Sequence, residues 1–337
     1  MLNRRQWFLV LVVMLGVLAA GRILWMGRSS EGPEVVVYSG RSQDLILPLL
    51  EQFTQETGIR VRARYGQTSE MASTILEEGR RSPADLFFAQ DAGALGVLAR
   101  HGRLDPLPKE LAELVDPRFR SPDGTWIGLS GRARVLIYHP DRVPADSLPE
   151  QLRELCDPYW RGRVGWAPAN GSFQAFVTAM RHTDGESAAT EWLTCMRRNA
   201  TREYANNTSI VLAVAAGEID VGLVNHYYLH ALQRSRGQEL NLRNHYPEEG
   251  VLVNVAGIGM LKTAPNRDAA ESLISFLLSE SSQRYFADKI FEYPLAAGVE
   301  PHADLPSIQT LRTPDLDLNR LDDLERTLRL MESIGLF

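Results

Sequence analysis

The chain has 337 residues, of which 44% are apolar and 23% charged, an ordinary globular composition that is long enough for two domains. Its net charge of −6 and isoelectric point near 5.7 argue against nucleic acid or an acidic membrane surface as the partner, because both would need a basic face. The expected partner is therefore a small ligand or another protein.

The N-terminal segment is typical of an export signal or a membrane anchor. Arg4 and Arg5 precede an apolar run that ends at Met26, and this basic flank predicts that the rest of the chain lies outside the cytoplasm. A lipoprotein box is incomplete, because Arg22 occupies the place of the lipidated cysteine. Cleavage and an uncleaved anchor are two alternatives, membrane contact is expected through this segment only, and residues 1–32 are excluded from the fold prediction.

The chain has two cysteines, Cys156 and Cys195, with no CxxC motif and no neighbouring histidine cluster. This pattern excludes metal–thiolate chemistry. In an exported protein the two cysteines could form one disulfide or stay as two buried thiols, and the sequence leaves both alternatives open.

The first third of the chain alternates between strand and helix patterns. Strands are expected at 34–38, 59–65 and 84–88, and helices at 44–57, 69–78 and 92–100. This alternation predicts an α/β fold with a mostly parallel sheet flanked by helices. Ligands of such sheets bind beyond the carboxyl ends of the strands, which gives the loops 39–42, 66–69 and 89–92.

A glycine-punctuated strand at 126–138 is the candidate crossing into a second lobe. Further strands are expected at 163–167, 219–225 and 251–261, the last returning to the first lobe, and helices at 174–181, 186–198, 209–216, 268–278, 281–287 and 318–334.

Common catalytic signatures are missing from the sequence. We find no GxSxG, HExxH, P-loop, GxGxxG or CxxC motif, so the chain is not expected to be an enzyme. His226 and His230 have the spacing of a helical metal pair, although solvated or capping histidines are commoner.

Two adjacent tyrosines, Tyr227 and Tyr228, follow the apolar run 219–225, where the pattern changes from strand to helix. Neighbouring side chains diverge by about 100° inside a helix, so the two phenols could converge on one ligand only at such a junction. An aromatic pair is more often half-buried packing. Phenolate is, however, a hard oxygen donor, and ferric iron is the obvious match for it.

Two polar loops, 170–172 and 206–209, each precede a predicted helix. Their backbone N–H groups and side-chain amides could form a cradle for an anion at the helix N-terminus. The plainer interpretation is that both loops are helix caps and turns.

Several ordered segments together resemble the ferric-iron-binding periplasmic proteins of ABC transporters. They are residues 36–41, 53–59, 77–79, 82–87, 129–134, 217–220, 225–228 and 292–295. The resemblance implies a two-lobed periplasmic-binding-protein fold with the site in the cleft between the lobes. We expect lobe 1 at 33–130 with 258–309, and lobe 2 at 131–257 with 310–337.

The resemblance also implies the ligands. Tyr227 and Tyr228 match the tyrosine ligands of the family, and the chain would bind Fe(III) with carbonate or phosphate as synergistic anion. It would act as a periplasmic monomer that delivers iron to an ABC permease. The residues at the positions of the anion site are Asn170, Gly171, Ser172, Asn207 and Asn225.

The first lobe departs from the family pattern. Ser42 stands where many members have a histidine ligand, and Gln90 stands where they have a glutamate ligand. Together with Asp91 they are the candidate cleft residues of this lobe, yet neither Ser42 nor Gln90 brings a negative charge. Either the bound anion supplies more of the charge, or a third tyrosine does. The candidates for that tyrosine are Tyr38, Tyr65 and Tyr204.

These losses keep a second hypothesis open, a metal-free receptor for a phosphate-bearing or other anionic small molecule. Relatives of the family bind such ligands, and the predicted anion cradle could hold one directly. An exported enzyme or a sensor module is a third, residual alternative.

Overall fold

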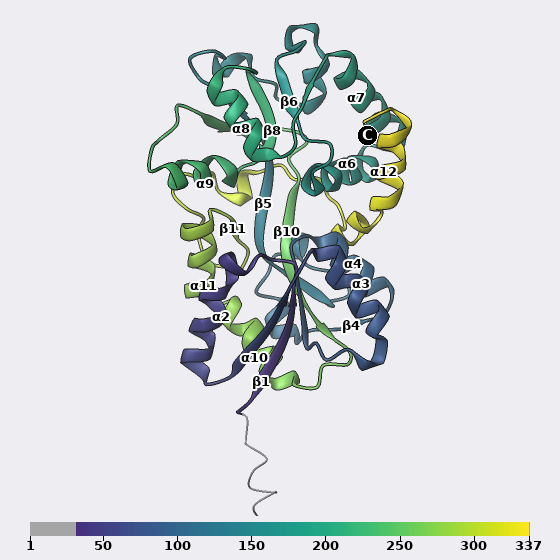
Figure 1. Ribbon diagram of the computed structural model, residues 1–337, viewed down its shortest axis with the longest axis vertical. Helices are drawn as coiled ribbons and strands as arrows, with labels where there is room; N and C mark the ends of the chain where they lie inside the picture. The colour runs from purple at the N-terminus through teal and green to yellow at the C-terminus, as the bar shows by residue number, and fades with distance from the viewer. Residues whose placement is uncertain (1–31, 337) are drawn as a thin grey trace, which may run out of the picture.

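Two long antiparallel strands, β5 (Trp126–Tyr138) and β10 (Val253–Leu261), run through the middle of the molecule and connect its two lobes (Figure 1). The computed structural model describes residues 32–336. The first part of β5 belongs to the sheet of the first lobe. From Arg134 onward, β5 pairs with β8 (Val221–Asn225) of the second lobe instead.

The first lobe is built on parallel strands β1 (Glu34–Ser39), β2 (Arg60–Tyr65) and β3 (Leu86–Ala89), in the order β2-β1-β3-β10-β5. Its helices are α2 (Gln43–Thr57), α3 (Thr68–Glu78), α4 (Ala92–Arg100), α10 (Arg267–Leu277) and α11 (Glu280–Tyr285). Short elements complete it: β4 (Leu104–Asp105), α5 (Lys109–Ala112) and β11 (Tyr293–Pro294).

The second lobe combines β6 (Val164–Trp166), β7 (Arg202–Glu203), β8 and β9 (Arg243–His245) with helices α6 (Gly171–Thr183), α7 (Glu186–Arg198), α8 (Asn207–Ala216) and α9 (Tyr227–Arg236). Its core is aromatic, with the rings of Trp166, Phe173, Phe176 and Trp192 in mutual contact. Cys156 and Cys195 form a disulfide, with Cα atoms 5.7 Å apart, so this alternative is the correct one.

The alternating pattern of strands and helices is confirmed, as is the mixed α/β class. The predicted helix over 318–334 is wrong, because the segment splits into the short helix η8 (Leu318–Asp322) and α12 (Leu324–Ser333). The helix breaks at Asp323. The carboxylate of this residue forms an ion pair with Arg181 of α6, at 3.0 Å.

This C-terminal crossing, residues 318–333, touches both lobes. η8 packs on α4 of the first lobe, where Asp322 binds Arg100 at 2.6 Å, and α12 packs on α6 of the second. The approach of η8 is close, since a Cβ on Gly93 or Gly96 would lie 2.6 Å from a backbone oxygen of η8.

The N-terminal signal or anchor lies outside the described residues. No helix within residues 32–336 is long and apolar enough to cross a membrane. The lobe boundaries at 130 and 257 stay a prediction.

Replacing Gly96 with alanine tests the packing of η8 on α4. On an exposed helix the change would stabilise by about 1 kcal/mol. Here the new methyl group meets the carbonyl oxygen of Asn319, and we expect a net loss of about 1–3 kcal/mol, measured by urea unfolding. A more stable variant would show that η8 does not hold this position.

Candidate metal and anion site

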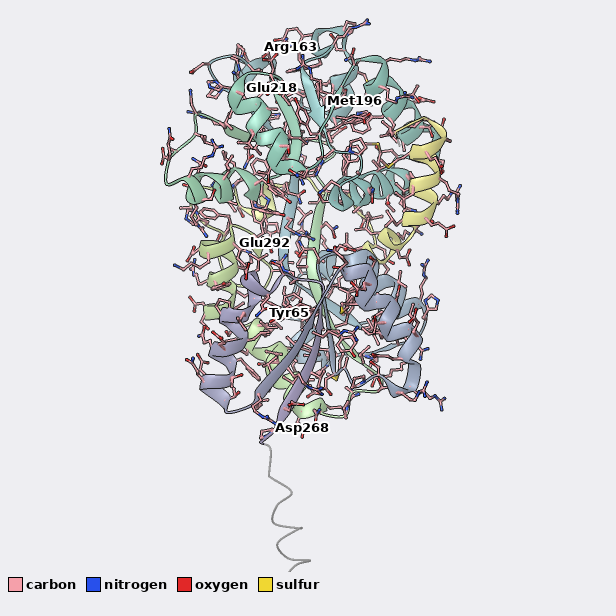
Figure 2. All side chains as sticks on the ribbon, in the orientation of Figure 1. Tyr65, Arg163, Met196, Glu218, Asp268 and Glu292 are labelled. Atoms are coloured by element: carbon pink, nitrogen blue, oxygen red, sulfur yellow. A yellow bond between two sulfur atoms is a disulfide. The ribbon has the colours of Figure 1, made fainter. Side chains whose placement is uncertain are left out.

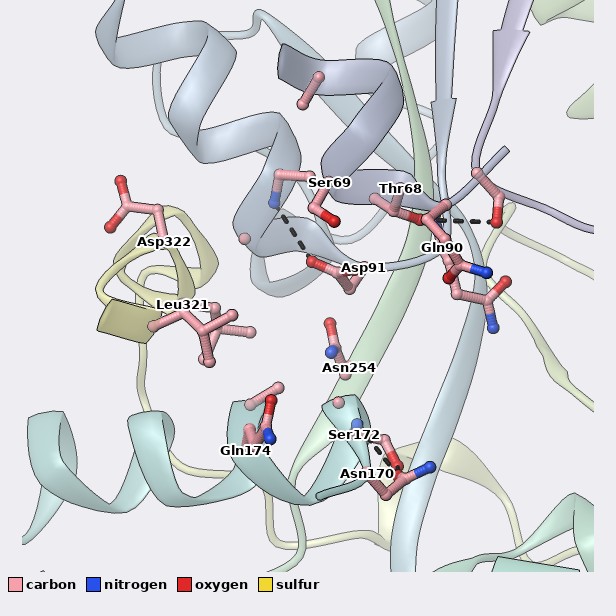
Figure 3. Close-up of a pocket in the computed structure, with 18 of the residues that line it drawn as sticks. Thr68, Ser69, Gln90, Asp91, Asn170, Ser172, Gln174, Asn254, Leu321 and Asp322 are labelled. Carbon is pink, nitrogen blue, oxygen red and sulfur yellow. Dashed lines mark hydrogen bonds between the residues drawn. The ribbon is translucent and has the colours of Figure 1, made fainter. Parts of the chain in front are cut away.

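A cavity of about 640 Å³ lies between the lobes, beyond the carboxyl ends of β1, β2 and β3 (Figure 3). The three loops predicted from the sequence all contribute to it. From the first lobe come Gly40, Gln67, Thr68, Ser69, Gln90 and Asp91; from the second come Asn170, Gly171, Ser172, Asn225, Tyr227 and Tyr228. The connecting strands β5 and β10 add Arg132 and Asn254, and the C-terminal crossing adds Leu321 and Asp322.

Tyr227 and Tyr228 occupy the predicted junction, because β8 ends at Asn225 and α9 begins at Tyr227. Their rings stack, with centroids 4.5 Å apart and planes at 26°. Both side chains line the cavity. The chain therefore presents two phenol oxygens from one place on the second lobe.

The phenol of Tyr227 is neutral at physiological pH. Burial raises its pKa, and the adjacent Tyr228 raises it further, although the charge of Arg132 opposes this. A ligand that needs phenolate must therefore displace a proton, which a trivalent cation does readily.

Arg134 lies beneath this region of the second lobe and is 3% exposed. Burial lowers its pKa to about 9, so it remains charged at neutral pH. Its Nη1 donates to Ser172 Oγ at 3.2 Å, Asn207 Oδ1 at 3.3 Å and Asn225 Oδ1 at 3.4 Å. One guanidinium thus joins three of the residues predicted to bind the anion.

The N-terminus of α6 forms the other side of the cradle. Asn170 is its N-cap, and its Oδ1 accepts from the backbone N–H of Ser172 at 3.2 Å. Gly171, the first residue of the helix, has open space at its Cα. A helix N-terminus of this kind favours an anion.

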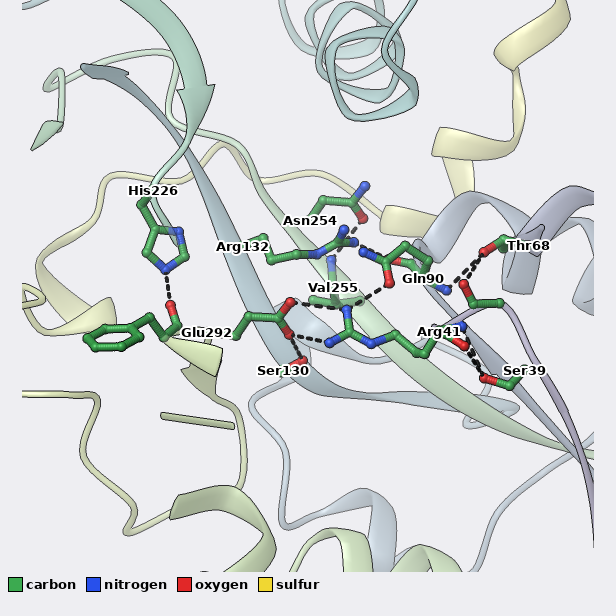
Figure 4. Close-up of polar contacts among 12 residues, drawn as sticks. Ser39, Arg41, Thr68, Gln90, Ser130, Arg132, His226, Asn254, Val255 and Glu292 are labelled. Carbon is green, nitrogen blue, oxygen red and sulfur yellow. Dashed lines mark hydrogen bonds and ion pairs between the residues drawn. The ribbon is translucent and has the colours of Figure 1, made fainter. Parts of the chain in front are cut away.

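Arg132, unlike Arg134, brings its guanidinium to the cavity wall (Figure 4). It is 4% exposed, donates to the carbonyl oxygen of Gln90, and its Nε has no hydrogen-bond partner within residues 32–336. No carboxylate of the described chain forms an ion pair with it. A buried guanidinium is costly when its charge is only partly balanced, here by the nearby carboxylates of Glu292 and Asp91, so this wall of the cavity favours a negative ligand.

A buried ion pair lies behind Gln90, outside the cavity lining. Arg41 and Glu292 are 0% and 1% exposed and form two hydrogen bonds, of 3.0 and 3.1 Å. Ser130 donates to the same carboxylate, which lies near the middle of the molecule (Figure 2). Arg41 also donates to Gln90 Oε1 at 2.7 Å, so the amide oxygen of Gln90 faces the pair.

Several predicted residues lie away from the cavity wall. Ser42 is exposed, caps α2 without a side-chain hydrogen bond and does not line the cavity, and Asn207 lies behind it against Arg134. The three candidates for a third tyrosine do not line it either: Tyr38 donates to Glu78, the buried hydroxyl of Tyr65 has no partner among residues 32–336, and Tyr204 packs on Gly165.

The two histidines near the tyrosines do not form a metal pair. His226 is fully buried, accepts from the backbone of Ala133 through Nδ1 and donates from Nε2 to the oxygen of Phe291 at 2.7 Å. Burial lowers its pKa to about 4, which keeps it neutral. His230 stacks on the ring of Phe291 instead. Within residues 32–336 no group of three His, Cys, Asp or Glu residues could hold a metal.

Arg132, Arg134 and Glu292 are the site residues that the sequence did not single out. The two arginines stand at alternate positions of one strand, which places both on the same face. That spacing, next to the glycines of 126–138, was the available signal.

Comparison with known proteins gives consistent relatives. The sequence profile described as bacterial extracellular solute-binding protein matches residues 73–320. The major ferric iron-binding protein of Neisseria meningitidis serogroup B is 33% identical over 312 residues, 90% of this chain and 93% of that protein.

Solved structures agree with this. Iron-bound HitA from Pseudomonas aeruginosa has a TM-score of 0.82 and 34% identity, covering 90% of this chain and 100% of that one. The Trichodesmium protein IdiA (FutA), in complex with iron and citrate, has a TM-score of 0.80 and 29% identity, covering 90% and 99%.

The Arg41–Glu292 pair can be tested with Glu292→Gln. This change leaves the guanidinium buried without a counter-ion, and we expect a loss of about 3–5 kcal/mol in urea unfolding at neutral pH. Burial opposes ionisation of Glu292, but the charges of Arg41 and Arg132 and the bond from Ser130 outweigh it and lower its pKa below the ordinary 4.5.

The wild-type advantage should therefore be present above that ordinary value and disappear as the pH falls through the lowered pKa of Glu292. A second variant, Arg41→Met with Glu292→Gln, removes the stranded charge and should recover most of the stability. A gap between wild type and Glu292→Gln that persists in acid would contradict the assignment.

Proposed function

The chain belongs to the bacterial extracellular solute-binding proteins, and on that premise we propose that it binds ferric iron with a synergistic anion and delivers it to an ABC permease. The resemblance to ferric-iron-binding periplasmic proteins is confirmed, the two-lobed fold is theirs, and the family consists of binding proteins, not enzymes. The protein is extracytoplasmic. We assign the N-terminal segment the role of export signal or anchor.

The observation that carries the proposal is the stacked pair Tyr227 and Tyr228 at the wall of an interlobe cavity. Hard phenolate donors suit a hard trivalent cation. Two phenolates leave one positive charge of the iron uncompensated, and Arg132 and Arg134 add more positive charge around the cavity. This balance favours an anion that carries at least two negative charges.

Carbonate and phosphate are the anions that we propose for the second-lobe cradle of Asn170, Gly171, Ser172 and Asn225, with Asn207 behind it. The Trichodesmium relative holds iron together with citrate, and a cavity of about 640 Å³ has room for a chelate of that size. Citrate therefore stands beside carbonate and phosphate as a candidate anion, with Arg132 as its first contact on the hinge side.

The first lobe would contribute little charge of its own. Of the three candidate cleft residues, Ser42, Gln90 and Asp91, only Asp91 is acidic. It lines the cavity, and one of its carboxylate oxygens accepts from the backbone of Ala94 at 3.2 Å. Burial raises its pKa, although Arg132 opposes this. We propose that the lobes close over the iron by bending at β5 and β10.

The tyrosines are tested with Tyr227→Phe and Tyr228→Phe. Purified protein loaded from a ferric chelate should show a visible phenolate-to-iron charge-transfer band, and each variant should weaken it. Each should also lower iron affinity by more than the roughly 10–100-fold that a supporting partner is worth. Tyr159→Phe is the matched control, because Tyr159 is 47% exposed and remote from the cavity lining. A colourless wild-type protein without iron by elemental analysis would reject the proposal.

The raised pKa of Tyr227 predicts how iron affinity depends on pH. Because iron must displace the phenol proton, affinity should fall as the pH falls, about tenfold per unit for each proton released. Competition against a chelator at about pH 6 and about pH 8, corrected for the protonation of the chelator, measures this slope. A flat profile would show that no phenol is deprotonated on binding.

The alternative of a metal-free receptor is separated by thermal shift. Stabilisation grows with the ratio of ligand concentration to Kd, so a panel of phosphate esters on iron-free protein should give no larger shift than inorganic phosphate if iron is the ligand. A large shift with one ester, without a charge-transfer band, would favour the alternative.

A further inference from the structure

Arg134 touches the proposed anion cradle from behind, without lining the cavity itself. We propose that it is a positioning residue that orients the side-chain amides of the cradle so that only N–H groups face the cavity. The cradle then selects an oxyanion whose facing oxygens are all acceptors. This inference rests on the anion role proposed above for the same residues.

The orientation of the amides follows from the chemistry of the guanidinium. Arginine has N–H donors and no acceptor, so an amide beside it must present its oxygen. Asn207 and Asn225 both place Oδ1 within 3.4 Å of Nη1 of Arg134. Arg134 and Asn225 are also paired across β5 and β8, which fixes the register of this contact.

Turning the oxygen of Asn225 toward Arg134 turns its amide nitrogen the other way. The Nδ2 atom of Asn225 has no hydrogen-bond partner within the described chain, and the residue lines the cavity. A donor without a partner at the wall of a cavity is ready for an acceptor from the ligand.

Asn170 is oriented by the same network, one step further out. Its Oδ1 accepts from the N–H of Ser172 at 3.2 Å, the hydroxyl of Ser172 at 2.5 Å and Nδ2 of Asn207 at 3.3 Å. Its own Nδ2 is then what remains for a ligand. The single hydroxyl proton of Ser172 is used for Asn170, and the oxygen accepts from Arg134 at 3.2 Å, so this hydroxyl offers no donor to a ligand.

The resulting surface of the cradle offers hydrogen-bond donors to the cavity and no side-chain acceptors. Asn170, Asn225 and the first N–H of α6 at Gly171 all offer donors, and the side-chain oxygens of the cradle are engaged inside the protein. Carbonate, ionised phosphate or a carboxylate fits such a surface. A neutral ligand with hydroxyl groups would find donors there and no acceptor for its own protons.

Asn225→Asp separates this arrangement from ordinary packing. The new carboxylate would gain an ion pair with Arg134, so the thermal midpoint should stay the same or rise. At the same time an acceptor would replace the donor that faces the cavity. Phosphate affinity of iron-free protein, measured by calorimetry, should therefore fall about 10–100-fold, the worth of one hydrogen bond to a charged group.

Asn206→Asp is the matched control. It makes the same change of charge at the exposed N-cap of α8, where aspartate caps as well as asparagine. Phosphate affinity should change by less than about threefold, because charge at an exposed site acts weakly.

Three results would overturn the inference: equal phosphate affinity in Asn225→Asp and wild type, a lower thermal midpoint in Asn225→Asp, or no phosphate binding by the wild type. The measurement contains no iron. A wild type that binds phosphate but develops no charge-transfer band with iron would reject the iron proposal alone and leave this inference standing.

Discussion

Buried positive charge on one strand is the constraint on which the site depends. β5 carries Arg132 and Arg134 on the same face, both nearly fully buried, and neither forms an ion pair with a carboxylate of the described chain. Desolvating a guanidinium is tolerable only when its hydrogen bonds are met. Arg134 meets most of this demand with amide, hydroxyl and backbone oxygens, whereas Arg132 donates to the carbonyl oxygen of Gln90 and lines the cavity. Within residues 32–336 the Nε of each arginine is without a hydrogen-bond partner. Arg134 therefore orders the residues around the site, and Arg132 is available to a ligand.

Much of the fold and part of the site were predictable from the sequence. The strand–helix alternation and the junction at Tyr227 follow from local hydrophobic period, which depends only on neighbours along the chain. The contacts of Arg134 depend on the pairing of residue 134 with residue 225 across two strands, which no local pattern encodes. Ser42 shows the converse limit, because its position in the motif suggested a ligand and its side chain lies in solvent.

The C-terminal segment was the clearest failure of the local pattern. The hydrophobic period of this segment predicts one helix over 318–334. In the structure the helix breaks at Asp323, because the residues before it pack on the first lobe and those after it pack on the second. Asp322 binds Arg100 and Asp323 binds Arg181, so adjacent carboxylates are tied to opposite halves of the molecule. Tertiary contacts override helix propensity here, as they often do for short segments.

That crossing has a practical meaning for anyone who wishes to turn the protein into a sensor. The residues before Leu336 are built into both lobes at the rim of the cavity, so a fluorophore or fusion partner attached there would report on the angle between the lobes. The same attachment would also stand in the way of the lobe closure proposed above. A label on the exposed face of α2, where Gln52 and Glu56 bond only to each other, would leave the motion free.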